Sequence, residues 1–179
     1  MERLWLSLLA SSLLSGWVFA AQGGELGLLV NGHAMHLDDR RGSENEANYG
    51  LGLQYDQPWR DQWLWFAFSS GFQSSQNAPA YNFGSGMRRR FHVSGPARLH
   101  MDFGAAAMVI AHDGYHKGGP VPALLPVASL GWSHFALNAA YVPPINDQVV
   151  PLVFLQFMYS LTPGGVPTLR TAQNGAGTP

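Results

Sequence analysis

The sequence predicts an all-β fold, an eight-stranded antiparallel transmembrane β-barrel of the outer membrane. Apolar residues alternate with small or polar residues along most of the chain between Glu25 and Leu161, which is the period of a strand with two different faces. Aromatic residues make up 12% of the chain and glycines number 21, while charged residues make up only 12%. This composition fits strands with one face toward hydrocarbon, and long connections alternate with short ones as in bacterial barrels.

The first four expected strands each carry the period-two pattern. Glu25 to Leu37 places its polar side chains, including His33, on one face. Asn48 to Asp56 alternates tyrosine and leucine with glycine and glutamine, and a short turn follows it. Gln62 to Gln73 is rich in aromatic residues, as strands often are, and Ala80 to His92 follows a polar loop.

The last four expected strands complete the barrel. Arg98 to His112 shows the clearest alternation, with one apolar face. Val121 to Gly131 and Phe135 to Val142 are separated by only a few residues and form a tight hairpin, and Val150 to Leu161 is the last strand. Closure of the sheet removes its edges and satisfies the backbone in lipid.

Residues 1–21 are predicted to be a signal peptide, residues 22–161 the barrel domain, and residues 162–179 a disordered tail. Arg3 gives the positive start, the following apolar run is too short to span a bilayer, and Val18 to Ala20 suits a cleavage site. The chain has no cysteine, so thiolate chemistry is excluded. The net charge of −1 argues against a nucleic-acid partner, no cofactor is expected, and the spacing of His112 and His116 across a loop is not enough to indicate a metal site.

If odd-numbered strands run outward, the inner face changes from charged to apolar along the barrel. The charged end contains Glu25, Gln54, Arg88, Arg90, Arg98, His100 and Asp102. The other end contains Met35, Gly84, Met108, Ile110, Ala140 and Leu152. The charges are expected to pair into a floor, because buried charges need partners. An apolar slot above the floor would suit one acyl chain, although periodicity alone favours a solid core.

A proline-rich stretch from Pro120 to Trp132 opens the sixth expected strand. Proline cannot donate to a β-ladder, so such a strand is weakly paired on one side. The run Pro-Val-Pro-Ala-Leu-Leu-Pro-Val-Ala-Ser resembles the sixth strand of the lipid A palmitoyltransferase (PagP) family of outer-membrane enzymes. The similarity extends upstream to Gly104, downstream to Pro143, and weakly to Gly32-His33-Ala34 and Asn45-Glu46, so that it covers most of Val30 to Leu161.

The resemblance implies an acyltransferase, active as a monomer, that moves a palmitoyl chain from an outer-leaflet phospholipid to a hydroxyl of lipid A. It implies that the slot, with Gly84 at its floor and Met108 in its wall, binds the donor chain. It also implies that gaps beside Pro126 and Pro143 admit the lipids laterally. His33 matches the family's functional histidine and is expected to face inward as the general base.

The family's Asp-Ser pair is not present in this sequence. One alignment places Ser74 and Ser75 at the two positions, and a second places Ser69 and Ser70 there. Neither alignment supplies the aspartate, so Asp38 or Asp39 is considered as the missing carboxylate.

Three other functions stay open. A non-enzymatic outer-membrane barrel, structural or adhesive, is the main alternative, and the altered Asp-Ser pair favours it. A lipid A deacylase would also use histidine and serine, but the proline run does not indicate one. A lipocalin-like carrier would need a polar outer face, whereas the expected outer faces are apolar.

Overall fold

The computed structural model describes residues 23–37, 46–74, 76–93, 99–112, 119–144 and 151–162. It contains eight strands: β1 (Glu25–His36), β2 (Ala47–Arg60), β3 (Trp63–Gln73), β4 (Pro79–His92), β5 (Leu99–His112), β6 (Val121–Trp132), β7 (Phe135–Val142) and β8 (Leu152–Ser160). The expected signal peptide, Arg98, and the tail beyond residue 162 lie outside the described residues. No helix in the described part is long and apolar enough to cross a membrane.

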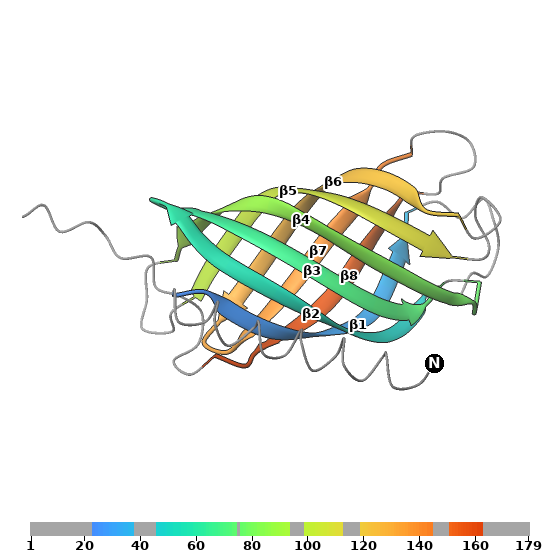
Figure 1. The fold of residues 1–179 in the computed structure, drawn as a ribbon, viewed down its shortest axis with the longest axis horizontal. Helices are drawn as coiled ribbons and strands as arrows, with labels where there is room; N and C mark the ends of the chain where they lie inside the picture. Colours follow the sequence, from blue (N-terminus) through green and yellow to red (C-terminus); the bar gives the residue numbers. More distant parts are fainter. Residues whose placement is uncertain are drawn as a thin grey trace, which may run out of the picture.

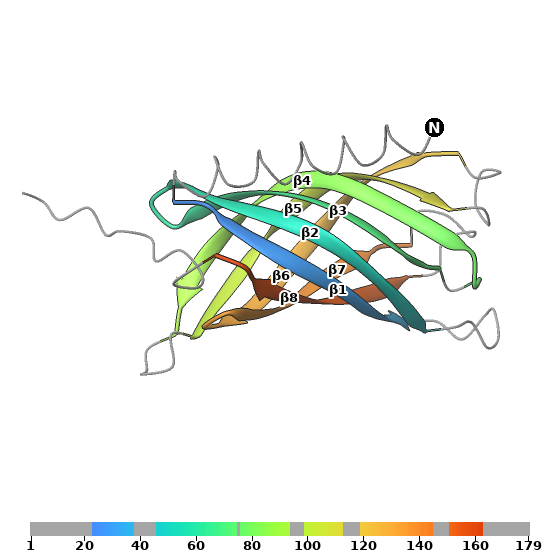
Figure 2. The ribbon, with the colours of Figure 1, turned by 60° about the horizontal axis from the view of Figure 1, so that its bottom comes forward.

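The strands form one closed antiparallel barrel in which each strand pairs with its sequence neighbours and β1 also pairs with β8. Figure 1 shows the strands inclined to the long axis, and Figure 2 shows β1 between β2 and β8 at the point of closure. The predicted fold class is therefore confirmed. Because β1 leads into the longest connection, which joins it to β2, we call the end of the barrel that contains His36 the outer end.

Strand β2 is longer than the sequence suggested. It continues through Pro58 to Arg60, and its pairing with β3 shifts register between Pro58 and Arg60. The expected turn therefore shrinks to Asp61 and Gln62, with Asp61 at a positive φ of 49°. The extension keeps Asp56 inside the barrel wall, where it is fully buried.

The outward side of the barrel is apolar. Exposed aromatic residues near the short-turn end include Trp59, Trp63, Trp65, Trp132, Phe135 and Tyr159, and those nearer the outer end include Tyr49, Tyr81, Phe83 and Tyr141. Two bands of amphipathic rings separated by aliphatic side chains are typical of a barrel that spans a hydrocarbon layer. The same residues would be unfavourable in contact with water.

A buried ion-pair network lies inside the barrel toward the short-turn end. The Arg90 guanidinium donates two hydrogen bonds to Asp102, from Nε at 2.9 Å and from Nη2 at 2.8 Å. Arg88 lies between both carboxylates, with its Nη2 bonded to Asp56 and its Nε 3.2 Å from Asp102 Oδ2. Gln54 donates to Asp56 at 2.8 Å. In this network two guanidinium groups are paired with two carboxylates, as burial requires, so the predicted pairing of inward charges is present.

Candidate active site

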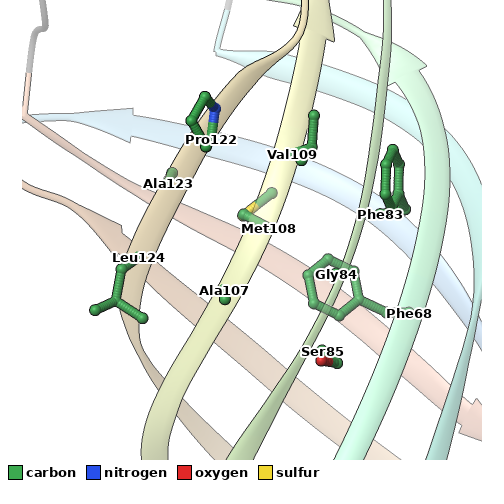
Figure 3. A pocket seen from close by; sticks show the side chains of 10 residues that line it. All are labelled: Phe68, Phe83, Gly84, Ser85, Ala107, Met108, Val109, Pro122, Ala123 and Leu124. Carbon is green, nitrogen blue, oxygen red and sulfur yellow. The ribbon is translucent and has the colours of Figure 1, made fainter.

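An apolar hollow of about 740 Å³ lies in the wall formed by β3 to β6. Figure 3 shows its lining residues, which are Phe68, Phe83, Gly84, Ser85, Ala107, Met108, Val109, Pro122, Ala123 and Leu124. Phe68 and Gly84 are register partners on β3 and β4, and Met108 faces Gly84 from β5. Gly84 and Met108 therefore lie together in an apolar hollow.

Gly84 is needed where β4 approaches β5 closely. A Cβ atom at this position would lie 2.5 Å from the backbone oxygen of Ala107 and 2.7 Å from Met108 Cβ. A side chain at Gly84 would therefore force the two strands apart in addition to filling the hollow. Ala123 on β6 pairs with Met108 and already carries a Cβ, so it offers a cleaner position at which to change the volume of the hollow.

The ladder between β6 and β7 is short, with six residue pairs that run from Val127–Ala140 to Trp132–Phe135. On its other side, β6 pairs with β5 up to Val121. The outer half of β6, Val121 to Pro126, therefore has no strand partner on the β7 side in the described part of the chain. Pro126 is the first residue beyond the ladder, and Pro143 follows the last residue of β7. The prolines thus mark an interruption in the wall, as their chemistry predicted.

His33 does not face the lumen, and this part of the prediction is wrong. The pairing of β1 with both β2 and β8 shifts between Asn31 and His33, and against β8 Gly32 is an extra residue in the strand. Such a β-bulge reverses the faces of all residues that follow it. Ala34 is consequently buried at 3% exposure, while the His33 side chain is 46% exposed. Met35, also expected inside, is 45% exposed for the same reason.

The bulge brings two histidines around one carboxylate at the outer end. The backbone N–H of Ala34 donates to the carbonyl oxygen of Glu46 at 2.9 Å, which fixes Glu46 beside the end of β1. Its carboxylate Oε2 lies 3.4 Å from His33 Nε2, and its Oε1 lies 4.0 Å from His36 Nδ1. The alternative carboxylates Asp38 and Asp39 lie outside the described residues.

The candidate serines lie on β3 or directly after it, two strands away from His33. Ser74 is 7% exposed, on the inward side, and its Oγ accepts a hydrogen bond from Ala78 N at 3.2 Å. Ser70 is also buried, and its hydroxyl donates to Asn82 Oδ1 at 2.7 Å. Ser75 lies outside the described residues. With about 4.8 Å between neighbouring strands, the backbones of His33 and Ser74 are about 10 Å apart. Because the His33 side chain is exposed on the outside and the Ser74 side chain is buried on the inward side, the structure does not place them on one face of the wall.

In the described part of the chain, no group of three or more His, Asp or Glu side chains is arranged to hold a metal ion. The chemical groups at the outer end are thus imidazole, carboxylate, hydroxyl and amide. The apolar hollow is formed by β3 to β6, whereas His33 and Glu46 lie at the outer end of β1 and just before β2.

Comparison with protein families identifies the chain's relatives. Residues 28–156 match the family model described as antimicrobial peptide resistance and lipid A acylation protein PagP. The chain belongs to the PagP family. A curated PagP relative, the lipid A acyltransferase PagP of Citrobacter koseri, is 27% identical over 134 residues, which cover 73% of this chain and 71% of the relative.

The solved outer-membrane proteins that match the chain are more distant in sequence than this PagP relative. Neisserial surface protein A is 11% identical with a TM-score of 0.47, and the match covers 76% of this chain and 96% of that protein. Ail, the attachment invasion locus protein of Yersinia pestis, is 13% identical with a TM-score of 0.42, over 76% of this chain and 97% of Ail in one of its structures.

Sequence reasoning missed three residues that the structure places in contact with the site or its floor. Glu46 approaches His33 and His36 only because of the bulge and the position of β2, neither of which leaves a local sequence signal. Asp56 was missed as the partner of Arg88 because β2 was expected to end there. Extension of the alternation beyond Tyr55 would have identified it as an inward residue.

Proposed function

We propose that the protein is an outer-membrane lipid A acyltransferase that moves a palmitoyl chain from an outer-leaflet phospholipid to a hydroxyl of lipid A. The observation that carries this proposal is the apolar hollow at Gly84 and Met108, together with the interruption of the β6–β7 ladder at Pro126, in a member of the PagP family. An apolar barrel exterior supports the membrane location. The donor chain would occupy the hollow, and Pro126 and Pro143 would border the path of entry.

In this proposal His33 acts as the general base from the outer rim. The lipid A hydroxyl loses its proton to the imidazole, and its oxygen forms a new ester bond with the acyl carbon. The donor ester bond breaks, and the lysophospholipid oxygen takes the proton from the imidazolium. The outward position of His33 supports this role, because lipid A in the outer leaflet approaches the barrel from outside. Ser75 and Ser74 are proposed as the residues that complete the site.

Lipid A from cells that do or do not produce this protein tests the proposal by mass spectrometry. The expected result is one added acyl group whose mass equals that of palmitate. Purified protein in detergent micelles with defined phospholipid and lipid A should give the same product. Unmodified lipid A in both assays, from protein that still runs faster on a gel before heating than after, would favour a non-enzymatic barrel instead.

The volume of the hollow should determine which acyl chain is transferred. In an Ala123→Leu variant, three extra carbon atoms enter the hollow beside Met108, so we expect the transferred chain to become shorter by a few methylene groups. Mass spectrometry of the lipid A product measures this shift.

An Ala128→Leu variant is the matched control, because Ala128 lies on the same strand, β6, but does not line the hollow. This control should transfer the wild-type chain. The same chain length from the Ala123→Leu variant and from wild type would mean that the donor does not occupy the hollow.

A further inference from the structure

Glu46 is the only acidic residue at the outer end among the residues that the structure describes, and it has a defined position. The hydrogen bond from Ala34 N to its carbonyl oxygen ties its backbone to β1 immediately after the bulge. Its two carboxylate oxygens are directed toward different histidines, His33 at 3.4 Å and His36 at 4.0 Å. The shorter of these two contacts involves the histidine that is proposed as the base.

We propose that Glu46 is a positioning residue of the acyltransferase site and that it acts through His33. The inference rests on the proposed function and adds a residue to it. A carboxylate beside one ring nitrogen of a histidine favours the tautomer with hydrogen on that nitrogen and fixes the plane of the ring. With Nε2 directed toward Glu46, Nδ1 is the nitrogen that takes the proton of the attacking hydroxyl.

A structural role for the Glu46–His33 pair does not explain the arrangement. The His33 and Glu46 side chains are 46% and 48% exposed, and ion pairs with this exposure contribute little to folding. Replacement of the carboxylate should therefore leave the barrel intact. Its effect should appear in the chemical step, where the carboxylate also stabilises the imidazolium that forms while the proton is held.

The test measures acyl transfer by Glu46→Gln and Glu46→Asp variants in detergent micelles. We expect kcat of the Glu46→Gln protein to fall about tenfold, a modest loss because the pair is half exposed, with KM within twofold of wild type. The Glu46→Asp variant retains a carboxylate and should recover part of the loss. Asp61→Asn, which removes an exposed carboxylate at the opposite end of the barrel, should behave as wild type.

A double-mutant comparison identifies the residue through which Glu46 acts. In a His33→Asn background, Glu46→Gln should cause no further loss, because residues that act as one unit are not additive. In a His36→Asn background it should still cause the full loss. The reverse result would mean that Glu46 acts through His36, and equal losses in both backgrounds would mean that it acts alone. Either outcome overturns the proposal.

Nitrogen NMR of the His33 ring tests the inference without acyl transfer. The Nε2–H tautomer should dominate in the wild-type protein at neutral pH and should lose its predominance in a Glu46→Ala variant. A wild-type protein that transfers no acyl group but shows this change would contradict the proposed function alone. An active enzyme whose His33 signals do not respond to Glu46→Ala would contradict the role of Glu46 alone.

Discussion

A His33→Asn variant is expected to transfer acyl groups to lipid A between about one hundred and ten thousand times more slowly than wild type, because that is the range that a general base contributes. Asparagine has no nitrogen that can take a proton at neutral pH, although it is close to histidine in size. His33 is half exposed at the outer rim, so the substitution removes few packing contacts. The variant should fold normally and run as a compact barrel on an unheated gel.

The rate should be measured from product mass over a long time course, since the residual activity is expected to be small. His134→Asn is a suitable control, because His134 lies in the β6–β7 turn at the opposite end of the barrel. A His33→Asn enzyme with at least half of the wild-type rate would exclude His33 as the base. If the wild-type protein transfers no acyl group, and the His33→Asn variant only loses the compact barrel form, the non-enzymatic alternative is favoured.

The serines of the proposed site can be separated in the same assay. Ser75→Ala should reduce transfer if Ser75 belongs to the site. Ser70→Ala should mainly affect stability, because the Ser70 hydroxyl is already engaged with Asn82. If only Ser70→Ala lowers the rate at unchanged stability, the alignment that uses Ser69 and Ser70 is the correct one.

An Asp102→Asn variant is expected to lose about 3–5 kcal/mol of the free energy of unfolding, as when one partner of a buried ion pair is removed. Asp102 is fully buried and accepts two hydrogen bonds from the Arg90 guanidinium, and Arg88 Nε lies 3.2 Å from Asp102 Oδ2. Asparagine is almost identical in shape, but it leaves the positive charge of Arg90 without its carboxylate inside the barrel.

Urea unfolding of the protein in detergent micelles or lipid vesicles measures this loss. Asp61→Asn should change the free energy of unfolding by less than about 0.5 kcal/mol, because Asp61 is in an exposed turn. A loss below about 1 kcal/mol for Asp102→Asn would mean that water reaches the ion-pair network and screens its charges.

Much of the fold could be predicted from the sequence because period-two alternation determines which residues share a face. It placed Arg88, Arg90 and Asp102 on the inner face correctly, and the structure shows that they pair. It failed after Gly32, because one inserted residue reverses the faces and alternation cannot reveal where a bulge occurs. His33 and Met35 were misplaced for that single reason.

The candidate site was less predictable than the fold. Contacts such as His33–Glu46 depend on the register between strands and on the bulge, which no local pattern encodes. The hollow was easier to foresee, since glycine, methionine and alanine at inward positions leave room between strands. Sequence reasoning therefore placed Gly84 and Met108 together but did not identify the polar contacts at the outer end.

The interrupted β6–β7 ladder also affects the backbone groups that β6 presents to the lipid. Between Val121 and Pro126, β6 has no strand partner on the β7 side among the described residues. Unpaired backbone groups are not tolerated in contact with hydrocarbon. Pro122 and Pro126 lack the N–H group, but the carbonyl groups of this segment still require water or lipid headgroups. Proline at two of these positions therefore lowers the number of unpaired donors that the open segment of β6 presents to the lipid.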